Sequence, residues 1–478
     1  MTLFTKLAAC GLLTLLMGCS YGDARDKATE KAPIFPDYTD VTVPANIAPL
    51  NFSISGAKHL KATLTGTNGE ELKLKGSDYI DIPLKKWHEL TAHNQGKSIS
   101  VSLQAWTEDH PEGVSYPAFQ IHIDAEPIDD YAVYRLIPPG YEEWNKMGIY
   151  QRNLTDFTQT CIVENRQNNK GCVNCHNFAW YNPERMMFHA RGKGGGTIVT
   201  DGGTIQKIDL PSLGPHKGGT YPMWHPSGNY IIFSSNKTRQ SFYTHCYDKI
   251  EVYDLESDLI LYDAKRQTVT TDERFTDSIN WETFPAFSPD GKYLYFCTAK
   301  AKAMPMETGQ LKYSLVRVPF DEETGQLGEP IDTIYSADRQ GGSVSVPRIS
   351  PDGRYVLFTW ASCATFHIQH KEADLHLIDL ATNEEIVPDN VNSDETDSYH
   401  AWSSNGRWVL FASRRLDGRY TRLFIAPFKD GQFGKPFLLP QRDPKQNELL
   451  LFSYNVPELA KGKVNLPSDQ LAEMFNVD

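Results

Sequence analysis

The sequence predicts an all-β protein, and three observations lead to this prediction. Aromatic residues make up 12% of the 478 positions, and 34 Gly and 29 Pro interrupt the chain at short intervals. Between these breaks, short segments alternate apolar and polar residues with the period of two that is typical of strands. A strand-turn-strand pattern also recurs through the second half of the chain. Together these features predict β-structure that is rich in turns.

Residues 1–18 have the organisation of an export signal, with a short positive start and an apolar run up to Met17. The run ends with Gly18 before Cys19, which resembles the bacterial lipobox. The resemblance implies cleavage after Gly18 and a lipid anchor on Cys19. Ser20 resembles the residue found there in lipoproteins that are sorted to the outer membrane. We therefore expect an outer-membrane lipoprotein that faces the periplasm or the cell surface; an ordinary secretory signal is the alternative.

Two units are predicted before the recurring pattern begins. Residues 19–33 are polar and charged, which indicates a flexible tether. Residues 34–126 contain short alternating segments such as 98–103, and their number and spacing predict an immunoglobulin-like β-sandwich. Trp87 and Trp106 are expected in its core.

The recurring pattern predicts the architecture of the second domain. Tyr221–Phe233 recurs as Phe284–Phe296, as Val346–Phe358 and, in worn form, as Tyr399–Phe411, at spacings of 63, 62 and 53 residues. Each copy has two strand-like segments around a tight turn of the Pro-Asp-Gly type. Spacings of this size fit one four-stranded blade of a β-propeller for each copy.

These copies resemble the TolB-type, WD40-like propeller repeat. The resemblance implies a propeller over residues 130–456, a C-terminal tail at 457–478 and a role in binding envelope proteins. A fifth, degenerate copy at Phe178–Phe188 and a closing strand at Leu449–Tyr454, paired with the start of the domain, favour six blades. Seven blades are the alternative.

The segment Cys172-Val173-Asn174-Cys175-His176 matches the pattern required for covalent attachment of a c-type haem. The thiols of Cys172 and Cys175 would bond the two vinyl groups, and His176 would be the proximal ligand of the iron. Export supports this prediction, because c-type haem is attached outside the cytoplasm. Two alternatives stay open. Cys161, eleven positions before Cys172, could complete a Cys3His zinc site, and the two thiols could form a disulfide.

The register of the fifth copy predicts that this motif lies just before the inner strand of a blade, near the propeller axis. The distal iron ligand is then sought on the same face of the ring. The geometric candidates are His216 and His400, and the candidates close in sequence or in the neighbouring blade are Met187, His189, Met223 and His225. A methionine ligand would raise the reduction potential relative to two histidines.

The formal net charge of −13 argues against binding to nucleic acid. The membrane is expected to be contacted through the lipid anchor only. We expect an electron-transfer protein or haem-based redox module with a redox or envelope protein as partner. The alternative is a non-catalytic scaffold that binds envelope proteins or glycans around a structural metal site. A haem-dependent reductase or peroxidase ranks third, and the sequence has no Gly-x-Ser-x-Gly elbow of a hydrolase.

Overall fold

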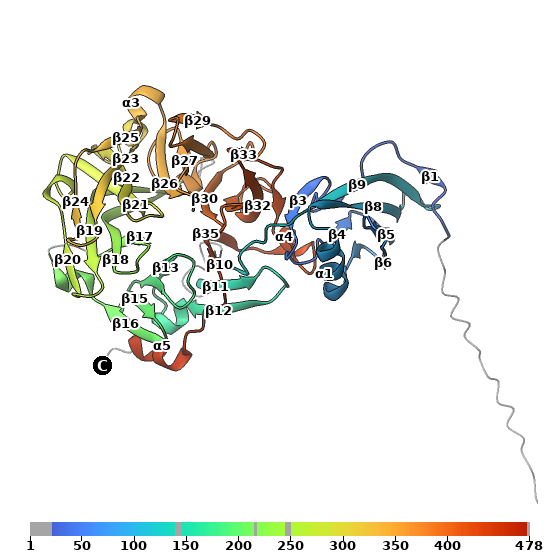
Figure 1. Ribbon diagram of the computed structural model, residues 1–478, viewed down its shortest axis with the longest axis horizontal. Helices are drawn as coiled ribbons and strands as arrows, with labels where there is room; N and C mark the ends of the chain where they lie inside the picture. The colour runs from blue at the N-terminus through green and yellow to red at the C-terminus, as the bar shows by residue number, and fades with distance from the viewer. Residues whose placement is uncertain (1–21, 139–145, 215–217, 244–249, 476–478) are drawn as a thin grey trace, which may run out of the picture.

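The computed structural model describes residues 22–138, 146–214, 218–243 and 250–475. Cys19 and His216 lie outside the described residues. The chain forms an N-terminal β-unit beside a β-propeller, as Figure 1 shows in blue and in green to red. In the part of the chain that is described, no helix is long and apolar enough to cross a membrane.

The N-terminal unit consists of two sheets and one helix. The larger sheet has the strand order β1-β9-β8-β5-β6, with β3 also paired to β9, and the smaller sheet has the order β2-β4-β7. The strands are β1 (Asp26–Lys27), β2 (Ile34–Phe35), β3 (Val41–Pro44), β4 (Phe52–Ile54), β5 (His59–Thr65), β6 (Glu71–Gly76), β7 (Tyr79–Ile80), β8 (Lys97–Trp106) and β9 (Val114–Asp124).

This unit departs from the antiparallel immunoglobulin-like pattern that the sequence predicts. β1 and β3 both pair with β9 in parallel, and β1 lies within the predicted tether. Helix α1 (Leu84–His93) follows Pro83 and buries Trp87 and Leu90, which are three positions apart and so share one helical face. The expected core positions are confirmed, because Trp87 is 0% exposed and Trp106 is 4% exposed.

From β10 onward, the described strands form six antiparallel sheets of four or five strands. In chain order the strands of the first four sheets are β10 (Tyr131–Ile137), β11 (Gly148–Asn153), β12 (Gln159–Glu164); β13 (Val173–Phe178), β14 (Met186–Ala190), β15 (Gly196–Asp201), β16 (Thr204–Ile208); β17 (Thr220–Trp224), β18 (Tyr230–Phe242), β19 (Ile250–Asp263), β20 (Thr268–Thr270); and β21 (Asn280–Phe287), β22 (Tyr293–Lys300), β23 (Ser314–Asp321), β24 (Gln326–Leu327), β25 (Asp332–Tyr335).

The last two sheets contain β26 (Ser343–Ile349), β27 (Tyr355–Ala361), β28 (Asp374–Asp379), β29 (Glu384–Ile386); and β30 (Asp397–Trp402), β31 (Trp408–Ser413), β32 (Arg422–Lys429), β33 (Gln432–Phe433), β34 (Phe437–Leu438). In the second to sixth sheets, the first strand in chain order is the inner edge of the sheet. Six sheets are the number that a six-bladed ring needs.

The two ends of the domain pair with each other. β35 (Ser453–Ala460) is antiparallel to β10 and forms the inner edge of the first sheet. This is the ring closure that the sequence predicts, but the closing strand starts at Ser453 rather than Leu449, which ends the short helix α4 (Gln446–Leu449). Pairing of this kind leaves no open inner edge between the first and last sheets.

Short helices lie between and after the sheets. Helix α3 (Ala337–Gln340) precedes β26, and α5 (Ser468–Phe475) follows β35 in the predicted tail. Leu471 and Phe475 of α5 are each 1% exposed and pack with Val173 and Phe188 of the second sheet. The C-terminal segment is therefore part of the propeller core.

The N-terminal unit contacts the last sheet of the propeller, which lies beside it in Figure 1. Arg407 forms an ion pair with Asp124 in which both side chains are 18% exposed. Asp129 accepts hydrogen bonds from the backbone N–H and hydroxyl of Ser404, at 2.7 and 2.6 Å. These buried polar contacts stabilise the orientation of the N-terminal unit relative to the propeller.

Candidate functional site

The cysteine motif lies on an inner strand of the propeller. Cys175 and His176 are within β13, and Cys172 directly precedes it. The expectation that the motif lies before the strand is wrong, because Phe178 ends β13 and corresponds to Trp224, the last residue of β17. The loop that follows β13 is longer than the loop that follows β17, which shifted the register inferred from the repeat.

Each inner strand carries one β-bulge at the same place, and each bulge contains one residue with positive φ. These residues are Cys175 (55°), Tyr221 (47°), Phe284 (50°), Val346 (52°), Tyr399 (22°) and Val456 (46°). All six line one small cavity, so the bulges converge at the centre of the ring. Cys175 is therefore the equivalent, in its strand, of the aromatic and aliphatic residues that close the axis in the other five.

The residue after the bulge position differs in a way that singles out the motif. It is Pro222, Pro285, Pro347 or Pro457 in four strands, and His176 or His400 in the other two. Proline suits a bulge because this position does not need a backbone N–H for the ladder. Histidine at this position places an imidazole where the other four strands carry a proline ring.

The imidazole of His176 is buried and has no hydrogen-bond partner. His176 is 1% exposed, and neither Nδ1 nor Nε2 makes a hydrogen bond within the described structure. Burial lowers the pKa of His176 to about 4, and the backbone groups of Val133 and Val456, which lie near the ring but outside hydrogen-bond geometry, oppose the shift. The ring is thus neutral at physiological pH and retains a nitrogen lone pair, as a metal ligand must.

The two thiols of the motif differ in exposure. Cys175 is 7% exposed and Cys172 is partly exposed, and both are free rather than joined in a disulfide. Burial raises the pKa of the Cys175 thiol, so the protonated form is favoured. Two free thiols beside an unpartnered imidazole are the donor set that the sequence predicts for haem attachment.

A buried cation lies against this motif. Arg135 of β10 is 6% exposed, and its Nη2 donates to the Sγ of Cys172 at 3.3 Å and lies 2.6 Å from the Sδ of Met147. Its Nε has no hydrogen-bond partner, and none of the described carboxylates forms an ion pair with it. A buried guanidinium without an anion is costly, which indicates that this place receives negative charge from another group.

The central cavity itself is small. It measures about 40 Å³ and is lined by Asn174, Cys175 and His176 on the motif side and by Arg348 opposite. One water molecule needs roughly 10–15 Å³ of such volume, so this space suits a few water molecules rather than a porphyrin. Arg348 also forms an ion pair with Glu458 of β35 at 2.7 Å, and Asn177 donates a hydrogen bond to the same carboxylate.

The zinc alternative is not assembled by the fold. Cys161 lies on β12, the outer strand of the first sheet, where it pairs with Tyr150, whereas the other three ligands lie at an inner strand. Among residues 22–475 outside the gaps, no group of three or more His, Cys, Asp or Glu side chains is placed to hold a metal ion.

The distal-ligand candidates that the structure describes have other environments. His400 follows the bulge of β30, and its Nε2 interacts with the carbonyl of Leu357 at 3.0 Å. His225 interacts through Nδ1 with Ser227 and through Nε2 with the carbonyl of Gly291. These two imidazoles are held between blades by the backbone of a neighbouring sheet.

The remaining candidates pack within the blades. Met187 is 0% exposed in the apolar core beside Trp224, and Met223 packs in the next cluster along the chain. His189 of β14 interacts with Thr197, and burial lowers its pKa to about 4. The structure therefore does not favour any one of these residues as the distal iron ligand, and the distal ligand stays a prediction.

Sequence reasoning missed Arg135 and Met147 as neighbours of the motif. A signal for Arg135 existed, because it is the only charged residue in the apolar segment Tyr131–Ile137. Met147 offered none, since a single methionine before a strand is indistinguishable from a core residue.

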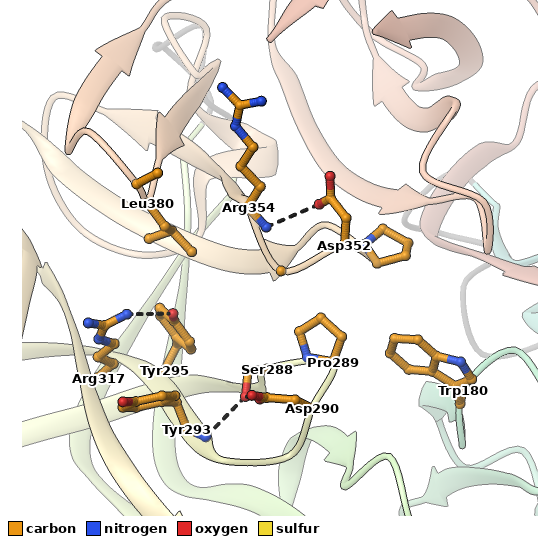
Figure 2. Close-up of a pocket in the computed structure, with 13 residues that line it drawn as sticks. Trp180, Ser288, Pro289, Asp290, Tyr293, Tyr295, Arg317, Asp352, Arg354 and Leu380 are labelled. Carbon is orange, nitrogen blue, oxygen red and sulfur yellow. Dashed lines mark hydrogen bonds between the residues drawn. The ribbon is translucent and has the colours of Figure 1, made fainter. Parts of the chain in front are cut away.

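A second concave feature lies away from the motif. A groove of about 640 Å³ lies between the β21–β22 turn and the β26–β27 turn. Figure 2 shows Trp180 at one end of it and Arg317 and Leu380 at the other. We call it the turn groove. Trp180 comes from the loop between β13 and β14, in a different sheet.

No protein-family model matches this chain, and no curated protein matches it. Solved structures with a similar fold include an oligogalacturonate lyase in complex with manganese, with a TM-score of 0.36, 11% identity and coverage of 63% of this chain and 71% of that one. A prolyl endopeptidase has a TM-score of 0.35 and 7% identity over 65% of this chain and 42% of that one. The tricorn protease has a TM-score of 0.31 and 12% identity over 81% and 32%. Likeness at this level concerns the fold alone.

Proposed function

We propose that this protein is a haem-bearing propeller of the bacterial envelope, with one c-type haem bound through Cys172 and Cys175, and that it acts in electron transfer or as a haem-based redox module. The observation that supports this proposal most is His176. It replaces the proline found at four equivalent bulges, it is 1% exposed, and both of its ring nitrogens lack a partner.

The residues around the motif fit the chemistry of a haem. His176 would coordinate the iron, and the Arg135 guanidinium, which forms no ion pair with the described carboxylates, would compensate the negative charge of a propionate. Because the enclosed cavity of about 40 Å³ is too small, the porphyrin would lie toward the partly exposed Cys172. A bound haem supplies a one-electron carrier whose potential is set by its axial ligands and burial.

The proposed location follows from the sequence. The export signal and the lipobox resemblance at Cys19 support an outer-membrane lipoprotein. The resemblance to the TolB-type repeat supports an envelope protein as partner, and the haem motif supports a redox protein. Export also provides the compartment in which c-type haem is attached, so the two proposals support each other through independent residues.

The test is a pyridine haemochrome spectrum with a haem-stained denaturing gel, on full-length protein made in cells that mature c-type cytochromes. We expect a covalent c-type signal that Cys172→Ser and Cys175→Ser abolish. Cys161→Ser is the matched control and should retain the signal, because Cys161 lies on the outer strand β12. Colourless wild-type protein from such cells would overturn the proposal.

The second candidate function is a binding scaffold without haem. One observation favours it, namely the turn groove of about 640 Å³ with the exposed Trp180 at its end. Ligand binding at the turn groove is also compatible with haem attachment, because the groove and the motif do not share a residue.

A further inference from the structure

Trp180 and Tyr181 occupy an unusual backbone conformation. Their φ angles are 49° and 63°, so two consecutive bulky residues lie in the left-handed region. This region is sterically unfavourable for an L-residue and is rarely occupied by large side chains. The side chain of Tyr181 packs against the main core, whereas Trp180 is 41% exposed. The strained backbone is thus not explained by burial of the Trp180 ring, which points to a function for this side chain.

This backbone conformation places the indole of Trp180 at the turn groove. Figure 2 shows Trp180 pointing toward the turns that carry Pro289 and Asp352, which belong to the fourth and fifth sheets. Trp180 itself follows β13 of the second sheet, so its loop reaches toward sheets that are not its neighbours. An aromatic wall facing a groove of this volume is typical of a ligand site.

Two carboxylates of the groove, those of Asp290 and Asp352, can accept further hydrogen bonds. Asp290 accepts through Oδ1 from the Ser288 hydroxyl at 2.6 Å and from the Lys292 N–H at 3.1 Å. Asp352 repeats this arrangement with the Arg354 N–H and a serine hydroxyl. Both carboxylates are exposed, and the contacts of the described residues engage Oδ1 only. Each Oδ2 can therefore accept a hydrogen bond from a ligand.

The cations of the groove are already paired. Arg354 forms an ion pair with Asp379 at 2.9 Å. Arg317 pairs with Asp332 at 3.1 Å, donates to the Tyr295 hydroxyl at 3.2 Å and stacks on a neighbouring tyrosine ring. An anionic ligand would have to compete for these guanidinium groups, so the groove favours a ligand that donates hydrogen bonds and carries no negative charge.

We propose that the turn groove binds a neutral saccharide chain, with one sugar ring on the face of Trp180 and hydroxyl groups donated to Asp290 and Asp352. A pyranose has an apolar C–H face for the indole and hydroxyl donors around its rim, which matches both halves of the groove. A proline-rich peptide also packs on aromatic rings, but its backbone offers mainly carbonyl acceptors, and these do not match two carboxylates. The site is independent of the haem proposal.

The test uses the haem-matured full-length protein without its lipid anchor and five probes: cellohexaose, xylohexaose, mannohexaose, maltohexaose and chitohexaose. Binding is measured by isothermal titration calorimetry. We expect at least one probe to bind in the micromolar to low millimolar range. Trp180→Ala should weaken that binding at least tenfold, and Asp290→Asn with Asp352→Asn should weaken it similarly.

Phe242→Ala is the matched control, because Phe242 is 70% exposed and does not line the groove. It should bind as the wild type does. The haem absorbance of every variant should be unchanged, which separates failure of this proposal from failure of the haem proposal. The inference is overturned if no probe binds, if Trp180→Ala binds as the wild type does, or if a decaproline peptide binds in a Trp180-dependent way and the sugars do not.

Discussion

Arg135 of β10 donates a hydrogen bond to the Sγ atom of Cys172, at 3.3 Å, and so joins the first sheet of the propeller to the cysteine motif at the second. The guanidinium is 6% exposed and faces two sulfur atoms rather than a carboxylate. Sulfur is a weak acceptor, so this contact does not compensate the charge. In protein without haem, we therefore expect the buried charge of Arg135 to lower the stability of the fold around the motif.

Arg135→Met should stabilise the protein when it is made without haem maturation. The substitution removes a buried charge that pairs with none of the described carboxylates, and it retains most of the side-chain volume. We therefore expect a gain of about 1–2 kcal/mol in the free energy of unfolding. Urea denaturation checks this. Arg152→Met is the control, since Arg152 is also buried but donates to Gln441 and to the carbonyl of Pro440, and its loss should destabilise. Equal losses in both variants would contradict the interpretation of Arg135.

Arg407→Ala should loosen the N-terminal unit from the propeller. It leaves the carboxylate of Asp124, 18% exposed, without its partner and the Phe428 carbonyl without its donor. We expect a loss of about 1–3 kcal/mol and an earlier transition of the N-terminal unit in differential scanning calorimetry. Arg25→Ala removes an ion pair whose side chains are 76% and 58% exposed, and should change stability by less than about 1 kcal/mol.

Phe475→Ala should destabilise the propeller although it lies in the last turn of the chain's final helix. The side chain is 1% exposed and packs in the cluster that contains Val173 of β13. Truncation of a buried phenylalanine costs about 3–5 kcal/mol, and urea denaturation should show a value toward the lower end because the site is near a chain end. Leu449→Ala, at a residue 73% exposed, should have an effect within about 0.5 kcal/mol. A Phe475 variant as stable as this control would show that α5 does not contribute to the core.

Glu282→Gln should flatten the dependence of stability on pH. Glu282 is 2% exposed, its Oε1 accepts from Thr298, and its Oε2 has no partner, so burial raises its pKa from 4.5 to about 8. Between these two values the folded state holds a proton that the unfolded state has released. The contribution of this group to stability is therefore present at low pH and falls as pH rises from about 4.5 to about 8.

The measurement is the free energy of unfolding in urea at pH 5, 6, 7 and 8. The wild type should lose up to about 1.4 kcal/mol for each pH unit in this window through Glu282, and the Gln variant should lose less. Glu108→Gln, at a side chain 82% exposed, should follow the wild type. Parallel curves for wild type and Glu282→Gln would show that this carboxyl titrates normally.

The propeller could be predicted from the sequence mainly because of its repeats. The turn residues and the flanking apolar segments specify hairpins locally, and their recurrence predicts a propeller whose ends pair, which the strand order shows. The N-terminal unit was less predictable. Helix α1 depends on the burial of Trp87 and Leu90 against the sheets, and the parallel pairing of β1 and β3 with β9 joins segments far apart in the chain, which no local pattern encodes.

For the site, the sequence by itself determined the donor set, because the spacing of Cys172, Cys175 and His176 is a local property of five residues. The tertiary structure decided where that set lies and what surrounds it. Convergence of six bulges at the axis buries His176, and the ring closure brings Arg135 to the motif from another sheet. The tertiary structure also separates Cys161 from the cysteine motif and places Trp180 beside the fourth and fifth sheets. These relationships arise from packing between sheets, and contacts across a closed ring are not encoded in any single stretch of sequence.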